Sequence, residues 1–382
     1  MARAHPSDRS IAIIGAGIIG LSCALEFARR GTRVTLFEKA WPPRGASWAA
    51  AGMIAPAFEA IGVSGGHSKL FELCDASARL WPDWAVQLER ESGQSSGFHP
   101  GPSLAIALDQ AEAAHLAAVQ AALKDYDLAP EDCTDQLPAL EPTLTDKAVS
   151  GLLLPSDGQA DNRLTLEALA SCAEQHERIE INLSAPHLIS EHGRLRHQGY
   201  DATLLTAGWQ SGDLTLQDQG REVSLQVLDP ALAELQPIGG QMLSVAPIEN
   251  GPKRTIRSGH IYIVPKADRI VIGATSEPGQ ALTVPQPDQI ADLRAQAIAL
   301  CPVLAEAPVL ETWAGVRPGF KSHAPMLGQT RLPGLYVATG HYRNGILLAP
   351  LTAKLMADLI LDGEAGSLIS AFAPDRQLSA QV

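Results

Sequence analysis

The stretch Ser10–Glu38, SIAIIGAGIIGLSCALEFARRGTRVTLFE, is the strongest indication of the fold of this chain. Its apolar start predicts a buried strand over 10–14. The segment 21–30 has the composition of a helix, and Gly31 follows at the position where a glycine commonly ends one. A second apolar run predicts another strand over 34–38. The stretch therefore predicts a strand, helix and strand in direct succession, which is the first unit of a doubly wound sheet.

Three glycines occupy the turn between the first strand and the helix, at Gly15, Gly17 and Gly20. In this G-x-G-x-x-G spacing the first glycine permits a tight turn and the second lets the backbone approach a pyrophosphate. The third lets the helix pack closely on the strand. Glu38 ends the second strand, where a carboxylate accepts hydrogen bonds from ribose hydroxyls. The pattern predicts a dinucleotide site, leaves NAD and FAD open, and disfavours NADP because Glu38 would repel a 2′-phosphate.

A second strand–loop–helix unit lies near the end of the chain, at 334–363, with the sequence GLYVATGHYRNGILLAPLTAKLMADLILDG. The loop between Gly340 and Gly345 contains one arginine, Arg343. Loops at the carboxyl ends of strands are where open α/β sheets bind ligands. A guanidinium held there is suited to a carboxylate or a phosphate, which it can bind through two parallel hydrogen bonds.

Length, composition and charge restrict the class of protein. The chain has 382 residues, 46% of them hydrophobic and 19% charged, which predicts two globular domains or one elaborated domain. A net charge of −13 argues against a nucleic-acid partner. Five cysteines without a C-x-x-C pair favour reduced thiols, and no metal-ligand cluster is evident. The apolar run 11–25 imitates a secretory signal, but the glycine motif accounts for it. No other run could span a bilayer, so a cytoplasmic protein is expected.

The rest of the chain mixes helices and strands without regular alternation. Helices are predicted over 70–92 (with a possible break at Pro82), 105–126, 162–177 and 290–300. Strands are predicted over 201–207 and 241–245, with a hairpin formed by 261–264 and 269–274. This mixture predicts an α/β fold, α+β overall, with a Rossmann-like domain and a second, mainly antiparallel domain. The expected boundaries are 1–85, 146–215 and 311–382 for the first domain and 86–145 and 216–310 for the second.

Other candidate site residues each have a plain structural alternative. The small residues of 44–53 could let a cofactor approach the backbone, or could form a tightly packed turn. Ala207 and Gly208 end a strand that could pass the cofactor, or could simply leave the sheet. Arg317, in the predicted loop WAGVRPG, could bind an anion or satisfy loop carbonyls. Tyr262 could bind a ligand or pack with its hydroxyl at a wet edge. The histidines at 176, 187, 192 and 197 are expected on the surface.

Several segments together resemble the D-amino-acid oxidase superfamily of FAD enzymes, and most of all its glycine oxidases, which serve thiamine biosynthesis. The matching pieces are IAIIGAGIIGLSCALEFARRG, FEK, ASWAAAGMIAP, YIVPKADRIVIGAT, WAGVRPG and GLYVATGHYRNGILLAP. They extend from Ile11 to about Gly363, and the last piece is the most specific. Two departures are that Ser276 stands where these enzymes often have a bulkier residue, and that 318–327 lacks the cysteine of members with covalent flavin. FAD is therefore expected to bind non-covalently.

The resemblance implies a role for each matching position. Arg317 and Arg343 would be the substrate-site arginines, with Tyr262 beside the substrate carboxylate. The cofactor residues would lie at the pyrophosphate turn, on the ribose side, along the flavin and around its pyrimidine end. They are Gly15, Gly17, Ile18, Ile19, Gly20, Glu38, Lys39, Ala46, Ser47, Ala51, Gly52, Met53, Ala207, Gly208, His341, Tyr342, Arg343, Asn344, Gly345, Ile346 and Leu347.

The activity implied by the resemblance is FAD-dependent oxidation of glycine, sarcosine or D-alanine to the 2-oxo acid, ammonia and hydrogen peroxide. Hydride would pass to the flavin without a side-chain acid or base, and molecular oxygen would reoxidise it. A homo-oligomer is expected. Two alternatives stay open from the sequence. One is a D-amino-acid dehydrogenase that passes electrons to a quinone or carrier, and the other is a flavin-binding module of a larger complex.

Overall fold

A six-stranded sheet contains the strand–helix–strand unit that begins the chain. The computed structural model describes residues 9–59, 68–127, 129–364 and 366–375. The strand order is β20 (Met326–Gln329), β21 (Leu335–Thr339), β11 (Ala202–Leu205), β1 (Ser10–Ile14), β2 (Arg33–Phe37) and β8 (Ile179–Asn182). All neighbours are parallel except β20, which runs antiparallel to β21. The carboxyl ends of β21, β11, β1 and β2 therefore lie side by side at one edge.

Helices cover one face of this sheet. They are α1 (Ile18–Arg29), α3 (Lys69–Ser92), α6 (Asn162–Gln175) and α10 (Gly345–Ala357), which continues as a π-helix over Asp358–Asp362. Phe27 of α1, Trp81 of α3 and Leu347 of α10 are buried in one apolar core. Burial of these large side chains is the main stabilising contribution to the layer.

The opposite face packs on a small four-stranded sheet and two short helices. Its strands are β10 (Arg194–Arg196), β9 (Ile189–Glu191), β12 (Thr215–Asp218) and β13 (Arg221–Ser224). The helices are α7 (Leu225–Leu228) and α8 (Pro230–Ala233). Leu205 and Val337 of the large sheet share a buried cluster with Leu216 and Leu232.

A nine-stranded sheet forms the second layer of the molecule. Its order is β18 (Glu277–Pro278), β14 (Gln236–Val245), β17 (Ile270–Gly273), β16 (Ile261–Pro265), β15 (Ile256–Ser258), β4 (Ser103–Ala107), β6 (Ser150–Leu154) and β5 (Glu131–Asp132), and β19 (Val309–Gly319) pairs with β14. Its outer face packs on α9 (Pro287–Leu300), and α4 (Gln110–Leu123) packs on β4 and β6. Most of its pairings are antiparallel, and β15 with β4 is parallel.

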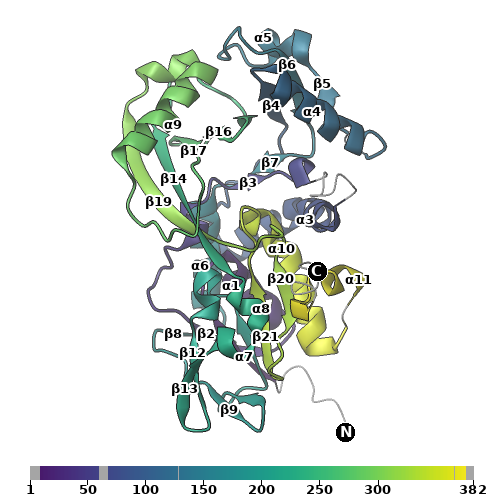
Figure 1. Cartoon of the computed structure of the whole chain (residues 1–382), viewed down its shortest axis with the longest axis vertical. Coiled ribbons are helices and arrows are strands. Elements are labelled where there is room, and N and C mark those ends of the chain that lie inside the picture. The colour runs from purple at the N-terminus through teal and green to yellow at the C-terminus, as the bar shows by residue number, and fades with distance from the viewer. Residues whose placement is uncertain (1–8, 60–67, 128, 365, 376–382) are drawn as a thin grey trace.

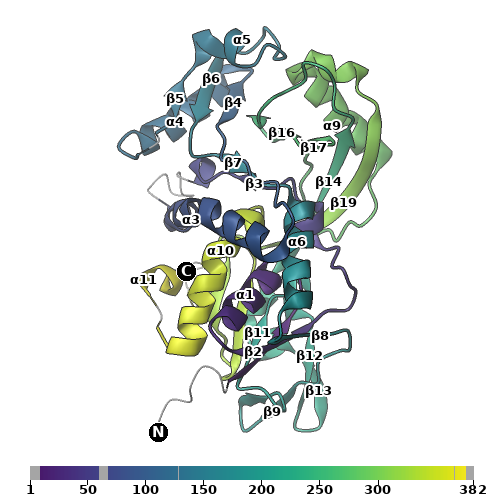
Figure 2. The ribbon, with the colours of Figure 1, turned by 180° about the vertical axis from the view of Figure 1, so that it is seen from behind.

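The two large sheets lie at opposite ends of the molecule, as Figures 1 and 2 show, with β3 (Met53–Ile54) and β7 (Gly158–Gln159) between them. The remaining elements are α2 (Ala46–Ala49), η2 (Ala57–Glu59), η3 (Thr134–Gln136), α5 (Leu137–Leu140), η4 (Gly208–Gly212), η5 (Pro302–Glu306) and α11 (Ser367–Ser370). The α/β class, with a Rossmann-like layer and a mainly antiparallel layer, is confirmed. The exact domain boundaries stay a prediction; β6 and β19 both pair within the nine-stranded sheet.

Several predicted elements need correction. The helix expected over 105–126 is the buried strand β4 followed by α4, which begins after Asp109, whose carboxylate accepts the N–H of Glu112. Pro82 lies inside one uninterrupted helix, α3. His197, expected at the surface, is 9% exposed and packs on Phe37 and Tyr200.

All five cysteines are free and buried. Within the described residues, no helix combines the length and apolar character that crossing a membrane would require.

Candidate functional site

The glycine turn between β1 and α1 is packed against the end of β11. Gly15 has φ +104°, and a Cβ there would lie 2.7 Å from the Thr206 carbonyl oxygen. A Cβ on Gly20 would overlap the Gly15 carbonyl. Thr206 Oγ1 donates hydrogen bonds to the carbonyls of Ile14 and Gly15, which fixes the turn beside Ala207. The predicted roles of the first and third glycines therefore follow from close contacts that only a glycine permits.

Side chains from β2 and α2 close around the same turn. The Glu38 carboxylate accepts the backbone N–H of Ala16 at 2.8 Å and that of Lys39 at 2.9 Å. Ser47 Oγ accepts the N–H of Ile18, in the first turn of α1, at 3.0 Å. Lys39 Nζ donates to Gln210 Oε1 at 2.7 Å, beside Gly208 in η4. These predicted residues thus meet at the carboxyl ends of β1, β2 and β11.

The loop from Gly340 to Asn344 reaches the same edge from β21. His341 is buried, its Nε2 lies 3.2 Å from Thr352 Oγ1, and burial lowers its pKa to about 3. Asn344 is buried at the start of α10, and its Nδ2 has no hydrogen-bond partner among the described residues. The Tyr342 N–H donates to the Pro318 carbonyl, which ties this loop to the end of β19. The loop therefore joins the two sheets.

The small-residue segment forms α2 and β3, and it lies between the sheets. Ala49, Ala51 and Met53 share an apolar cluster with Tyr262 and Trp313 of the nine-stranded sheet. Gly52 has φ +78°, and its carbonyl accepts the Ala160 N–H. The segment therefore forms the closely packed turn that the sequence offered as the structural alternative to a cofactor contact.

Two residues that the sequence did not indicate hold α2 in place. Asn162 Nδ2 donates to the carbonyls of Ser47 and Trp48 at 2.9 and 2.8 Å, and Trp313 Nε1 donates to the Ala49 carbonyl at 2.9 Å. Asn162 is more than a hundred residues from α2, so no local pattern could have identified it.

Arg317 lies on a strand and not in the loop that the sequence predicted. It occupies β19, and Arg317 and Trp313 share the inner face of the nine-stranded sheet, defined here as the face toward α2. The Arg317 Nη1 atom donates to the carbonyls of Gly239 and Thr275, both at 3.2 Å. A Cβ on Gly240 would overlap Nη1, so a glycine leaves the room for this side chain.

Tyr262 is on the same inner face, opposite Gly273 in the pairing of β16 with β17. Its hydroxyl donates to Met242 Sδ at 3.7 Å, and the Arg317 guanidinium is close enough to act on it electrostatically. Burial raises the pKa of Tyr262, while the charges of Arg317 and Arg257 act in the opposite direction. The hydroxyl is therefore near cationic side chains, and the residue as a whole is half-buried.

Arg343 has an ion-pair partner that the sequence did not indicate. Its Nε donates to Glu59 Oε1 at 2.8 Å, and Nη2 lies 2.6 Å from the same oxygen. Glu59 is buried at the end of η2, whereas the Arg343 side chain is 49% exposed. Arg343 is therefore partly exposed to solvent, and its charge is balanced by Glu59.

Further buried charges flank β3 and β7, and none of them was indicated by a motif. Lys266 Nζ donates to the Ala160 carbonyl at 2.7 Å, and burial lowers its pKa to about 7. Asp161 and Arg269 form an ion pair at 3.0 Å. Asp157 is fully buried, and burial raises its pKa to about 7.

The residues at this edge fit a flavin dinucleotide. The N-cap residues of α1 and α10 donate no side-chain cap, although Ser47 Oγ accepts the first N–H of α1, and both helices present a positive end. The glycine turn has no room for a Cβ at Gly15 or Gly20, and the buried Asn344 amide lacks a partner within the described part of the chain. Two helix ends facing one edge suit a ligand with a pyrophosphate and an electron-accepting ring.

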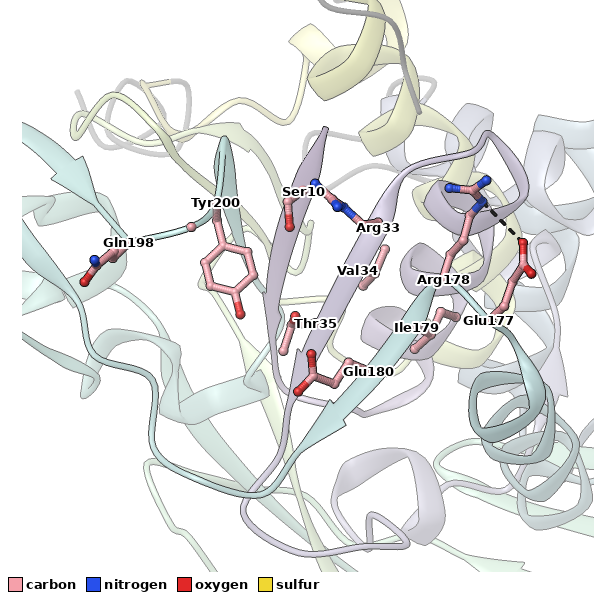
Figure 3. A pocket seen from close by; sticks show the side chains of 11 residues that line it. Ser10, Arg33, Val34, Thr35, Glu177, Arg178, Ile179, Glu180, Gln198 and Tyr200 are labelled. Carbon is pink, nitrogen blue, oxygen red and sulfur yellow. Dashed lines mark ion pairs between the residues drawn. The ribbon is translucent and has the colours of Figure 1, made fainter. Parts of the chain in front are cut away.

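A surface hollow of about 400 Å³ lies elsewhere, as Figure 3 shows. It is lined by the first residues of β1 and β2, by β8 and by the segment before β11, including Ser10, Arg33, Glu180 and Tyr200. These are the amino ends of the parallel strands, whereas the glycine turn follows their carboxyl ends. The hollow is therefore separate from the candidate site.

Comparison with known proteins finds a matching family and several relatives that cover most of this chain. The family model for FAD-dependent oxidoreductases matches residues 10–359. The glycine oxidase of Geobacillus kaustophilus is 30% identical over 382 residues, which cover 96% of this chain and 97% of that protein. The bifunctional protein ThiO/ThiG of Trichormus variabilis is 35% identical and covers 95% of this chain. This chain spans about half (54%) of that bifunctional relative's length.

Solved structures agree with the sequence relatives. The crystal structure of glycine oxidase from Geobacillus kaustophilus superposes with a TM-score of 0.83 at 28% identity, covering 96% of this chain and 98% of that one. The L-proline dehydrogenase from P. horikoshii superposes with a TM-score of 0.82 at 19% identity, covering 98% of this chain and 99% of that one, which indicates a shared fold.

Proposed function

This chain belongs to the family of FAD-dependent oxidoreductases, and on that premise we propose that it oxidises glycine or another small amino acid. It is an enzyme of that class with FAD as its cofactor. The proposed products are the 2-oxo acid, ammonia and hydrogen peroxide, and the proposed role is in thiamine biosynthesis. The names of the relatives, glycine oxidase and ThiO/ThiG, support this reading.

One observation supports the choice of an amino acid more than any other. The Arg317 guanidinium is anchored through Nη1 on two backbone carbonyls and lies near the Tyr262 hydroxyl. Its remaining N–H groups are suited to a carboxylate, since guanidinium binds carboxylates in a bidentate manner. A carboxylate held there would place the α-carbon toward α2 and β3, which carry the proposed flavin contacts.

The described side chains bind and orient the substrate in this proposal, and none is assigned as a general acid or base. When bound, FAD supplies the two-electron acceptor, and molecular oxygen is the proposed final oxidant. Arg317 and Tyr262 hold the carboxylate, which fixes the orientation of the amine and lowers the entropy cost of reaching the reactive geometry. The apolar cluster of Ala49, Ala51 and Met53 excludes water from this side of the site.

The two domains are proposed to bind different molecules. We propose that 1–85, 146–215 and 311–382 bind FAD, and that 86–145 and 216–310 hold the substrate. Arg317 belongs to the first set of segments but would bind the substrate, because its strand β19 pairs with β14 of the second set. A homo-oligomer in the cytoplasm also stays a proposal.

An anaerobic reduction panel tests the function directly. Purified yellow protein is mixed with glycine, sarcosine or D-alanine without oxygen, and the visible flavin absorbance is followed. We expect bleaching by at least one of the three. Absence of bleaching by all three would contradict the amino-acid proposal.

The electron acceptor needs a second experiment. The reduced protein is mixed with oxygen or with a quinone in a stopped-flow instrument. Faster reoxidation by oxygen, with peroxide formed in equal amount to the substrate consumed, is the result expected of an oxidase. Slow reaction with oxygen and fast reaction with the quinone would identify a dehydrogenase instead.

A further inference from the structure

A third arginine, Arg257, faces the region between Tyr262 and Arg343. In the pairing of β15 with β16, Arg257 is directly opposite Tyr262, so the two side chains share the inner face of the nine-stranded sheet. On its other side Arg257 is opposite Ala105 of β4, a small residue. The backbone register therefore places a guanidinium beside the tyrosine that the proposed function assigns to the substrate.

The short helix η2 connects Arg257 to Arg343. Its Phe58 ring lies under the Arg257 guanidinium, with Cζ 3.7 Å from the ring centroid. Its next residue, Glu59, binds Arg343. Stacking on a ring satisfies one face of a guanidinium and leaves the N–H groups at its edge free for an acceptor.

Arg257 has no acceptor of its own in the described part of the chain. No hydrogen bond or ion pair joins it to a carboxylate or carbonyl there. The segment 60–67, which lies outside the described residues, contains no Asp or Glu. Burial lowers the pKa of Arg257 to about 10, which is the expected effect of removing this cation from water.

The carboxylates of Asp157 and Glu59 attract Arg257 electrostatically, but neither forms a hydrogen bond or ion pair with it in the described part of the chain. Glu59 is bound by Arg343, and Asp157 Oδ1 accepts the Ala57 N–H at 3.4 Å. Burial raises the pKa of Asp157 to about 7, so its negative charge is only partly developed at neutral pH. The inner face therefore holds a guanidinium, that of Arg257, to which no described carboxylate or carbonyl is hydrogen-bonded, beside the tyrosine proposed for the first substrate carboxylate.

We propose that Arg257 is a second anion-binding residue of the substrate site, and that the preferred substrates are amino acids with a second carboxylate. This inference depends on the proposed function for the position of the first carboxylate. Arg257 is half-buried and stacked on Phe58 without a directly bound acceptor, and a carboxylate that enters with the substrate would supply one. The second carboxylate is carried either on the amine nitrogen, as in iminodiacetate, or on the side chain, as in D-aspartate.

The reaction of such a substrate is the same oxidation. Iminodiacetate loses one C–H and one N–H hydrogen with two electrons, and water cleaves the resulting imine to glycine and glyoxylate. Molecular oxygen takes up the two electrons and two protons as hydrogen peroxide, so the equation balances with one oxygen and one water per turnover.

The test compares Arg257→Met with wild type on matched substrates. Methionine retains an apolar stem of similar length and removes the charge. We measure kcat/KM for iminodiacetate, D-aspartate, its uncharged analogue D-asparagine, and glycine. Wild type is expected to prefer at least one dicarboxylate to glycine and D-asparagine by about tenfold or more. Arg257→Met is expected to lose that preference, because its kcat/KM should fall at least about tenfold further on the dicarboxylates than on glycine.

Two controls separate binding from folding. Arg294→Met makes the same substitution on α9, which covers the outer face of the same sheet, and should leave the preference unchanged. Isothermal titration of holoenzyme with succinate measures anion binding without turnover, and the dissociation constant should rise about tenfold or more in Arg257→Met. FAD content and thermal unfolding establish that each variant is folded.

The outcomes distinguish this inference from the proposed function. Oxidation of glycine or sarcosine without any preference for a dicarboxylate would overturn the role of Arg257 and leave the function intact. An equal loss on glycine and dicarboxylates in Arg257→Met would also overturn it, because the arginine would then serve the first carboxylate. No flavin reduction by any of these compounds would instead contradict the proposed function.

Discussion

At Arg317, the structure shows one of the two roles that the sequence presented as alternatives, and binding of an anion stays a prediction. The side chain donates to the backbone carbonyls of Gly239 and Thr275 and lies near Tyr262. The first set of contacts fixes the guanidinium, and a fixed guanidinium loses less entropy on binding an anion. A structural arginine and an anion-binding arginine are therefore compatible at this position.

Substitution of Arg317 tests its assignment. Arg317→Met should weaken substrate binding by about a hundredfold or more, because hydrogen bonds to charged groups contribute about 1.5–3 kcal/mol each. Anaerobic titration with substrate, followed by flavin bleaching, measures this loss. Arg317→Lys keeps the charge and should retain part of the affinity. The flavin spectrum and FAD content should not change, and loss of FAD would show that the residue is mainly structural.

Arg343 and His197 each have a contact that the sequence did not predict. Arg343 was expected to face the substrate, and the structure adds an ion pair with Glu59. His197 was expected in water and is buried beside Phe37. In both cases the partner comes from a different segment, so the neighbouring sequence carries no signal of it.

At the scale of elements, α2 depends on a residue outside itself. The four-residue helix is too short to be stable alone, since helix nucleation is costly. Asn162, the first residue of α6, donates to two of its carbonyls, and Trp313 donates to a third. The predicted cofactor residues Ala46 and Ser47 therefore owe their position to α6 and β19.

Asn162→Ala should loosen α2. The buried carbonyls of Ser47 and Trp48 lose their donor, so the free energy of unfolding should fall by about 1–3 kcal/mol. FAD affinity should fall with it. Denaturant unfolding and FAD titration of the apoprotein measure the two effects. Glu167→Ala, at an exposed position of the same helix, is the matched control, and an equal effect in both variants would refute a specific role for Asn162.

The segment 105–126 shows why some elements resist prediction. Its alanine content favours a helix throughout, yet 103–107 is a strand. That strand lies between β6 and β15, and its five residues are all buried. Pairing with two distant strands outweighs local helix propensity here, because burial and ladder hydrogen bonds contribute more than a few tenths of a kcal/mol per residue.

At the scale of the whole molecule, stability should depend on pH through His197. Burial, and then the charge of His187, lower the pKa of His197 to about 4, whereas an unfolded histidine has a pKa of about 6.5. Between these values the unfolded chain binds more protons. The free energy of unfolding should therefore fall as the pH decreases, by at most about 1.4 kcal/mol per pH unit.

The variant His197→Gln separates the contribution of His197 to the pH dependence from that of other titrating groups. The raised pKa of Asp157 produces the opposite slope up to pH of about 7, so the wild type alone is not decisive. His197→Gln does not titrate, and urea unfolding of both proteins at pH 7, 6 and 5 gives the difference. The variant should gain stability relative to wild type as the pH falls. A constant difference across the three pH values would argue against a buried neutral histidine.

The sequence established the Rossmann-like layer, the dinucleotide turn and the family resemblance, because these depend on residues that are close together in the chain. The glycine spacing of 15–20, the strand before it and Glu38 after it form one continuous unit, and local sterics determine its shape. The hairpin of β16 and β17 was predictable for the same reason.

The tertiary structure alone brought together the substrate side of the site. Arg257 and Tyr262 come from one hairpin, Arg317 from β19 and Glu59 from η2, and strand register and the packing of η2 bring these three segments together. Register is fixed by burial of an entire face of a sheet, which is a property of distant strands together. Contacts of that kind leave no periodic signal in any one segment, so the stacking of Arg257 on Phe58 became evident only in the folded chain.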